Sequence, residues 1–488
     1  MQFVYYRSYF YIDQNHQVAT GGYIIMVIQP KGAQKDVLAL DAKGHTVVLG
    51  TAGSGKTTMA LLLAEKMSNL GGHPKVLVVT FNRTLVTYMK DIQSFSHGIT
   101  VENFHHFALG YLKSTGKKTD NCVIHEDMKA GIIDAIVNAM HQKHPKESTF
   151  MRPVQTFLDE IQFLEWFGVE SLEQYIEMER IGRVDAYISR ENRHLFYAVY
   201  EIYKKKRAEA GYLYDWDDIA IAVYNSLLED TSERRYSHII VDEGQDFSPM
   251  MLKSLVKATA TNGSFTFFGD VAQQIYGNAL SWKASGISTQ KIWRFENNYR
   301  NPREIALFAQ DITKHNQWEA KGDEYVVPKF EIPAAGVKPM LVKYSDKQAE
   351  IAGITGLLKG KSGRNVVIVK NRSLVQTFIL SFRSKKIYAV EIKKENNSGL
   401  TDGTYVTTFY SVKGLEFDNV YIPFLNGEDF PDKDTLKLAE SENKVYSNSL
   451  KLFYVAATRA KQGLVMTYST SLTPLFPYDS QNYDSTNT

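Results

Sequence analysis

A glycine-rich segment that ends in a lysine and a threonine carries the clearest chemistry in this chain. Residues 50–57 read Gly-Thr-Ala-Gly-Ser-Gly-Lys-Thr, after an apolar run at 46–49 and before a helix-forming run at 59–65. Glycines let backbone N–H groups turn toward an anion, the helix N-terminus adds positive potential, Lys56 can reach the β and γ phosphates, and Thr57 can hold Mg²⁺. The segment therefore predicts a nucleoside triphosphate site. The predicted phosphate-binding loop comprises Gly50, Thr51, Ala52, Gly53, Ser54, Gly55, Lys56, Thr57 and Thr58.

Two adjacent acids follow a second apolar run. Residues 238–246 read His-Ile-Ile-Val-Asp-Glu-Gly-Gln-Asp, so the run predicts a buried strand that delivers Asp242 and Glu243 at its carboxyl end. Ligands of open α/β sheets bind at that end of the strands. We expect Asp242 to hold Mg²⁺ and Glu243 to orient and deprotonate the attacking water. The two segments together predict hydrolysis of a nucleoside triphosphate.

Six further motifs follow one another in a recognisable order. They are 80–85 (TFNRTL), 103–107 (NFHHF), 268–276 (FGDVAQQIY), 296–300 (ENNYR), 408–417 (TFYSVKGLEF) and 452–460 (LFYVAATRA). With the glycine-rich loop and the acidic pair, they resemble the motifs of superfamily 1A helicases of the UvrD/Rep/PcrA type. The resemblance extends over nearly the whole chain. It implies two RecA-like domains, ATP and Mg²⁺ as cofactors, and single-stranded DNA and single-strand/duplex junctions as substrates.

The resemblance also implies which residues complete the catalytic site. Arg300 and Arg459 are expected to approach the γ-phosphate from a second lobe, where charge develops during phosphoryl transfer. Gln273 is expected to sense the γ-phosphate and the attacking water. Closure of the two lobes on ATP, and their release after hydrolysis, would then drive movement.

Three residues are expected to bind the nucleoside. By resemblance, Tyr299 stacks on the adenine and Glu416 holds the ribose hydroxyl. Gln34 is the candidate for reading the adenine edge, because of its spacing to the phosphate-binding loop.

Single-stranded DNA needs aromatic faces for the bases and hydrogen-bond donors for the phosphates. The positions that resemble the family's DNA contacts are Phe81, Asn82, Phe104, His105, Tyr276 and Tyr410. Two of the motifs depart from the family pattern. Tyr410 stands where the family usually has His, and Asn278 stands where a base-stacking Trp often occurs, with Trp282 as a possible substitute.

The alternation of strand-like and helix-like segments predicts an α/β protein with parallel sheets. The best predicted strands are 76–79, 239–241, 265–268, 366–369 and 405–408. The predicted division is an N-terminal extension at 1–29, a first RecA-like domain (1A) at 30–107 and 212–285, a helical 1B insert at 108–211, a second RecA-like domain (2A) at 286–472, and a disordered tail at 473–488. The interval between Arg300 and Thr408 is too short for the large 2B insert of the family, which is therefore expected to be absent or vestigial.

Composition sets wider bounds. The chain has 488 residues, 44% of them hydrophobic, which suits two or three folded units. A net charge of +2 means that DNA binding must come from a local groove. The single cysteine, Cys122, excludes a disulfide framework. No apolar run approaches the roughly 20 residues of a membrane span, so a cytoplasmic protein is expected.

Two functional hypotheses remain open from the sequence. The first is an ATP-driven motor that walks 3′ to 5′ on single-stranded DNA and separates duplex. The second is a DNA-stimulated ATPase that senses DNA and regulates a partner nuclease, because the compact architecture is similar to that of the helicase-like subunit of the Gabija anti-phage system.

Overall fold

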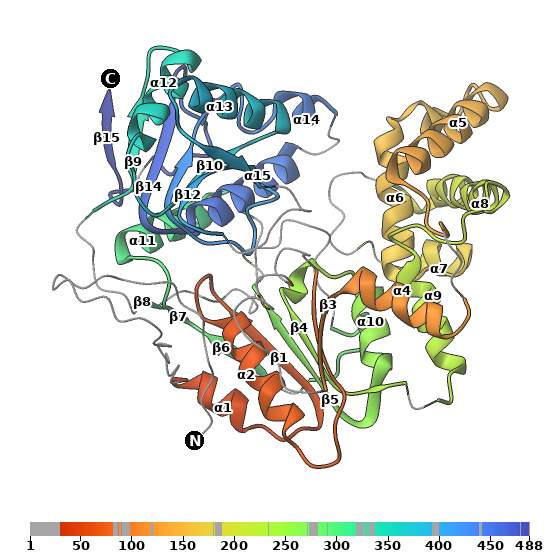
Figure 1. Cartoon of the computed structure of the whole chain (residues 1–488). Coiled ribbons are helices and arrows are strands. Elements are labelled where there is room, and N and C mark those ends of the chain that lie inside the picture. Colours follow the sequence, from red (N-terminus) through yellow and green to blue (C-terminus); the bar gives the residue numbers. More distant parts are fainter. Residues whose placement is uncertain are drawn as a thin grey trace.

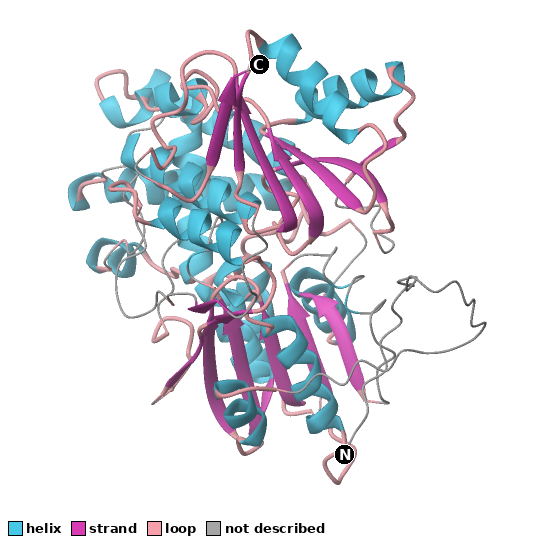
Figure 2. Cartoon of the chain, turned by 90° about the vertical axis from the view of Figure 1, so that its left-hand side faces the viewer, coloured by secondary structure: helices cyan, strands magenta, loops and turns pink. Residues whose placement is uncertain are grey.

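The computed structural model describes the chain from residue 30 to 487, apart from several short gaps. The described residues are 30–81, 86, 89, 98–117, 121–178, 180, 188–232, 234–270, 272, 282–289, 291–318, 326, 329–330, 337–392, 400–438, 442–478 and 480–487. They form two sheet-containing lobes and a group of helices beside them (Figure 1). Figure 2 shows the two sheets as separate sets of strands, one in each lobe.

The first lobe contains a six-stranded parallel sheet in the order β3-β2-β4-β5-β1-β6. Its strands are β1 (Gly44–Gly50), β2 (Val76–Thr80), β3 (Ile99–Asn103), β4 (Tyr236–Asp242), β5 (Thr259–Gly269) and β6 (Ile292–Phe295). The described helices of this lobe are α1 (Ala33–Ala39), α2 (Lys56–Ser68), α4 (Phe104–Ser114), α9 (Ile219–Glu229) and α10 (Pro249–Ala258), with the short η3 (Gly244–Asp246).

Both faces of this sheet are buried, which explains why its central strands are continuous apolar runs. Along β2, Leu77 and Val79 join one hydrophobic core, and Val76 and Val78 join another on the opposite face. Because all the strands are parallel, their carboxyl ends lie at the same edge of the sheet. The glycine-rich loop after β1 and the acidic pair at the end of β4 therefore share that edge.

A helical insert interrupts the first lobe between β3 and β4. It comprises α5 (Glu126–Lys143), η1 (Ser148–Met151), α6 (Val154–Phe167), α7 (Leu172–Glu177), η2 (Arg190–Asn192) and α8 (Arg193–Glu209), and it has its own hydrophobic core. Its two ends meet at a bridge between Val123 and Tyr214. The predicted start at residue 108 is wrong, because α4 packs its apolar face into the core of the first lobe and the insert begins after it.

The second lobe contains a seven-stranded sheet in the order β11-β12-β10-β13-β14-β9-β15. The strands are β9 (Met340–Lys343), β10 (Arg364–Val369), β11 (Ala389–Glu391), β12 (Gly403–Thr408), β13 (Phe417–Ile422), β14 (Ala460–Tyr468) and β15 (Asp484–Asn487). The helices are α11 (Arg303–Thr313), α12 (Lys347–Leu358), α13 (Arg372–Ser384), α14 (Lys433–Leu438) and α15 (Glu442–Ala457). A separate two-stranded pairing joins β7 (Asn297–Asn298), which follows β6, to β8 (Lys329–Phe330), which lies between α11 and β9 in the sequence.

Two predicted boundaries of the second lobe are wrong. The strand β6 pairs with β1 of the first sheet, so the second lobe begins after Phe295 and not at residue 286. The described residues of the predicted disordered tail, 473–478 and 480–487, include structured elements: Phe476 is buried, and β15 pairs with β9 as an edge strand. The strand residues Asp-Ser-Thr-Asn are all exposed, so no apolar alternation marks them in the sequence.

The expected α/β architecture of two lobes is confirmed, and all five predicted strands occur. Every element described between Arg300 and Thr408, apart from β8, belongs to the second lobe. Within the described residues, no helix is long and apolar enough to cross a membrane.

Candidate functional site

The phosphate-binding loop is shaped by two glycines and closed by a lysine. Gly53 and Gly55 have φ angles of 70° and 80°, in the left-handed region that other residues rarely adopt. Gly55 is the N-cap of α2, so the loop opens directly onto a helix N-terminus. The ammonium of Lys56 is buried and donates to the carbonyl oxygens of Gly50 at 2.9 Å and Thr51 at 2.8 Å. These two hydrogen bonds hold the ammonium of Lys56 beside the loop, where it can attract an anionic phosphate.

The second carboxylate oxygen of Asp242 marks a cation site. Thr57 Oγ1 donates to Asp242 Oδ2 at 2.6 Å, whereas Asp242 Oδ1 is buried and has no hydrogen-bond partner among the described residues. Burial and the adjacent Glu243 raise the pKa of Asp242 to about 7. A hydroxyl and a buried carboxylate with a free oxygen suit a hard divalent cation, so Thr57 and Asp242 fit Mg²⁺.

Glu243 has an unusual backbone conformation, and a neighbouring glutamine holds its side chain. Its φ is 52°, a strained value for a residue with a side chain. Gln245 Nε2 donates to Glu243 Oε2 at 2.5 Å, and Gln245 Oε1 accepts from the backbone N–H of Asp270 at 2.9 Å. Burial alone would raise the pKa of Glu243, but the charges of Lys413 and Lys56 lower it below its ordinary value. The carboxylate is therefore ionised and fixed in direction, as a general base requires.

Two contacts join the lobes around these acids. Lys413, in the loop after β12, places its ammonium 2.6 Å from Asp246 Oδ1, with both side chains at most 5% exposed. The backbone N–H of Tyr299 donates to the carbonyl of Gly53 at 2.9 Å, so the segment that enters the second lobe lies on the phosphate-binding loop.

Arg300 and Arg459 both lie at this interface. Arg459 is 1% exposed, and its Nε donates to the carbonyl of Val455 at 2.9 Å. Burial and the like charge of Arg300 lower the pKa of Arg459 to about 10, while Glu243, Glu416 and Asp270 act against them. The two predicted arginines are thus within electrostatic reach of each other, and Arg459 is also within reach of Glu243.

Glu416 contacts an arginine and a lysine. Its Oε1 accepts from Arg300 Nε at 2.7 Å, and its Oε2 lies 2.5 Å from Lys461 Nζ. Burial alone would raise the pKa of Glu416, but Arg300 and Lys461 lower it to about 2. Sequence reasoning missed Lys461, whose only signal is its position two residues after Arg459.

Gln34 and Tyr299 both contact the phosphate-binding loop. Gln34 Nε2 donates to the carbonyl of Ser54 at 3.0 Å, and Lys31 Nζ lies 5.8 Å from the centre of the Tyr299 ring. The amide of Gln34 thus contacts the loop itself. This cluster is where the sequence places the nucleoside. Gln273 lies outside the described residues.

The aromatic candidates for DNA contact separate into core and surface residues. Phe81 packs edge-on against His105 at 6.1 Å between ring centres, and His105 packs against Trp216 at 5.1 Å. Phe104 is wholly buried in the core of the first lobe, so the prediction that it contacts DNA is wrong. The first helical turn of α4 directs that ring into the core.

The remaining DNA candidates are placed in part. Tyr410, two residues after the end of β12, is 46% exposed. Trp282, the possible substitute for a stacking Trp, packs edge-on against Phe267 at 5.0 Å, toward the core of the first lobe. Asn82, Tyr276 and Asn278 lie outside the described residues. Trp216, which packs against His105, was not among the residues predicted to contact DNA.

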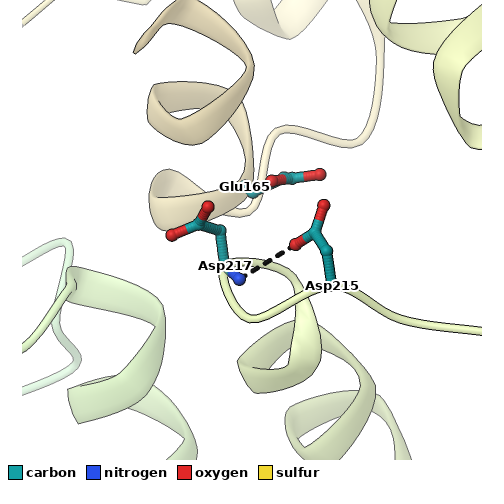
Figure 3. A group of neighbouring side chains, drawn as sticks. All are labelled: Glu165, Asp215 and Asp217. Carbon is teal, nitrogen blue, oxygen red and sulfur yellow. Dashed lines mark hydrogen bonds between the residues drawn. The ribbon is translucent and has the colours of Figure 1, made fainter. Parts of the chain in front are cut away.

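A second group of acids lies at the base of the helical insert. Figure 3 shows Glu165 at the end of α6 facing Asp215 and Asp217 on the loop before α9. Lys129 Nζ of α5 lies 2.9 Å from each of the three carboxylates. The ammonium occupies the position that a metal ion would take, so these four residues form an ionic joint between the insert and the first lobe. No catalytic role follows from them.

Comparison with known protein families identifies both lobes. Residues 31–299, more than half of the chain, match the model of the UvrD/REP helicase N-terminal domain. Residues 385–471 match the model of the UvrD-like helicase C-terminal domain.

Individual relatives are similar over long stretches. The putative ATP-dependent DNA helicase YjcD of Bacillus subtilis is 26% identical over 324 residues, which are 60% of this chain and 40% of that protein. DNA helicase II of Haemophilus influenzae is 24% identical over 56% of this chain and 39% of that protein. A probable DNA helicase of Mycoplasma pneumoniae is 24% identical over 89% of this chain and 82% of that protein. The chain thus spans about 40% of the length of the first two relatives.

Proposed function

We propose that this chain, which belongs to the UvrD/REP helicase family, is an ATP-driven motor that moves 3′ to 5′ on single-stranded DNA and separates duplex. The observation that carries the proposal is the composition of the site between the lobes. The first lobe supplies a phosphate-binding loop and an acidic pair, and the second lobe supplies two arginines to the same place. A site divided in this way hydrolyses ATP only when the lobes are together.

Each residue has one task in hydrolysis. Lys56 binds the β and γ phosphates, and Glu243 takes the proton of the attacking water. Arg300 and Arg459 stabilise the charge that develops on the γ-phosphoryl group. Thr57 and Asp242 would hold Mg²⁺, which neutralises phosphate charge and orients the oxygens.

The pairing of Arg300 with Glu416 suggests how closure depends on ATP. In the structure, Glu416 accepts from the guanidinium of Arg300. A γ-phosphate offers more negative charge, so Arg300 is expected to exchange the carboxylate for phosphate when ATP binds. Glu416 is then released toward the ribose, which reconciles its pairing with its expected role.

The DNA track is proposed to cross the first lobe beside Phe81 and His105 and to continue to Tyr410 of the second lobe. Bases stack on aromatic faces with little sequence preference. Single-stranded DNA and single-strand/duplex junctions are therefore the proposed substrates.

A second function is favoured by one observation. In the described residues between Arg300 and Thr408, there is no helical domain beyond the second lobe itself. A motor without a domain that grips the duplex could act as a DNA-stimulated ATPase that regulates a partner nuclease, with little unwinding of its own.

The decisive experiment combines ATP hydrolysis with strand separation. The purified full chain is assayed for ATPase activity with and without single-stranded DNA, and for unwinding of duplexes with a 3′ or a 5′ tail, with Lys56→Ala as the inactive control. The motor requires DNA-stimulated hydrolysis and unwinding from the 3′ tail. Stimulated hydrolysis without unwinding from either tail favours the regulatory ATPase. Unwinding only from the 5′ tail, or hydrolysis indifferent to DNA, overturns the proposal.

A further inference from the structure

One buried asparagine joins the two segments that carry the arginines. Asn301 is 2% exposed and follows Arg300 directly. Its Nδ2 donates to the carbonyl of Thr458 at 3.1 Å and to the carbonyl of Ala460 at 2.6 Å. These two carbonyls belong to the residues on either side of Arg459. A single amide group therefore fixes the backbone around Arg459 from a residue next to Arg300.

A second asparagine completes the connection. Asn298 Oδ1 accepts from the backbone N–H groups of Arg300 at 2.9 Å and Asn301 at 3.0 Å, and Asn298 Nδ2 donates to Asn301 Oδ1 at 3.0 Å. The polar atoms of the Asn301 side chain are thus all used. Asn298 also lies against the phosphate-binding loop, because a Cβ added to Gly53 would lie 2.6 Å from Asn298 Oδ1.

We propose that Asn301 is a positioning residue that holds Arg300 and Arg459 at one fixed separation, so that both guanidinium groups meet the γ-phosphate in the same closure of the lobes. This inference rests on the proposed function and deepens it. Asn301 does not touch the nucleotide in this role. It acts through the backbone of the two segments.

Electrostatics explains why the two arginines need such a brace. They carry like charges at a buried interface, and Arg300 contributes to lowering the pKa of Arg459. Like charges in a low-dielectric site repel more strongly than they do in water. Glu416, which pairs with Arg300, and Glu243 oppose part of that repulsion at Arg459. The hydrogen bonds from Asn301 to both carbonyls around Arg459 also hold the two segments together against the repulsion between the arginines.

A buried asparagine elsewhere in the second lobe provides a matched control. Asn426 is fully buried, donates to Asp429 Oδ2 at 2.9 Å, and accepts from the N–H groups of Ser469 and Thr470 at 2.8 and 3.0 Å. Like Asn301, it joins two distant segments through three hydrogen bonds of its side chain. None of its partners belongs to the ATP site. Asn426→Ala therefore reports what the loss of a buried asparagine does to the lobe in general.

The test is a double-mutant cycle on DNA-stimulated ATP hydrolysis by the full chain. The variants are Asn301→Ala, Arg459→Ala, the double variant and Asn426→Ala. Asn301→Ala is expected to lower kcat about 10- to 100-fold, because a misplacement of about 1 Å can cost that much, and to change the KM for ATP less than about threefold. The double variant is expected to be no more than about threefold slower than Arg459→Ala, because a brace has no effect once the arginine is gone. Asn426→Ala should keep the parental kcat even if its melting temperature falls as far as that of Asn301→Ala.

Several results would overturn the inference. They are an unchanged kcat in Asn301→Ala, losses that multiply in the double variant, or an equal loss of kcat in Asn426→Ala. If Asn301→Ala does not fold at the assay temperature, Asn301→Ser replaces it throughout the cycle. The serine hydroxyl can donate to only one of the two carbonyls, so a kcat below that of the parent is expected, and a kcat equal to that of the parent would overturn the inference.

The failure of this inference is distinguishable from failure of the proposed function. If the parent does not hydrolyse ATP, or if Arg459→Ala keeps the parental rate, the assignment of the site is wrong. If Arg459→Ala loses its activity while Asn301→Ala keeps it, only the role of Asn301 is wrong.

Discussion

Lys413 of the second lobe and Asp246 of the first lobe form an ion pair of 2.6 Å that is almost completely buried beside Glu243. Burial raises the pKa of Asp246 to about 6 even with this lysine present. Removing one partner of a buried pair is costly, at about 3–5 kcal/mol, because the other charge stays buried without compensation. The pair therefore links contact between the lobes to the charge around the proposed base.

Lys413→Met is expected to lower both the melting temperature and the maximal ATPase rate, the latter about tenfold or more. Adding Asp246→Asn should recover the melting temperature, because the uncompensated charge is gone. It should not recover the rate, because Glu243 still lacks its neighbouring cation. Thermal unfolding and steady-state kinetics of both variants test this, and recovery of both properties in the double variant would show a purely structural pair.

Lys56→Ala and Glu243→Gln should abolish turnover by different routes. Lys56 contributes to phosphate binding, so its loss should weaken ATP binding, which a fluorescent nucleotide can measure. Glu243→Gln keeps the shape of the site and should bind ATP normally while hydrolysis falls about 10²- to 10⁴-fold. Hydrolysis by Glu243→Gln within about tenfold of the parental rate would contradict its role as base.

Arg300→Ala and Arg459→Ala should each lower kcat by about 10³ or more, because an arginine acts on charge that appears mainly in the transition state. Affinity for ATP should change less. The comparison is sharpest at saturating single-stranded DNA, where the lobes close most often. A weaker affinity with an intact maximal rate would contradict the assignment for that arginine.

The strands that could be predicted from the sequence are those buried on both faces of a sheet. The strands that carry the phosphate-binding loop and the acidic pair are buried on both faces, so they appear as continuous apolar runs. Short edge strands give no such signal. The four residues of β6 include one buried residue, and their segment was assigned to the wrong lobe, whereas β15 is wholly polar and exposed and was not expected at all.

Within the site, only residues whose type and neighbours indicate a chemical role could be predicted from the sequence. Lys56, Thr57, Asp242 and Glu243 could be identified from residue type and context. The pairing of Lys413 with Asp246 joins residues that are far apart in the sequence. Neither residue alone indicates its partner, because the contact depends on how the two lobes pack.

The ionic joint at the base of the insert makes stability depend on pH in a predictable direction. Glu165 is fully buried, and its Oε1 has no hydrogen-bond partner among the described residues. Burial, together with the nearby charge of Asp215, raises the pKa of Glu165 well above its ordinary value despite the opposing charge of Lys129. Between the unfolded pKa, about 4.3, and the raised folded pKa, the folded state binds more protons, so stability falls as pH rises through that interval.

Glu165→Gln mimics the protonated side chain and should remove this contribution. The variant is expected to match the parent near pH 5 and to become the more stable of the two as pH rises toward 8. Melting temperatures across that range measure the difference. Glu229→Gln serves as the control, because Glu229 is 78% exposed in its pair with Lys117, and its melting curve should follow the parent. Parallel losses of stability in the parent and in Glu165→Gln would mean that Glu165 is ionised in the folded protein and that Lys129 balances its charge.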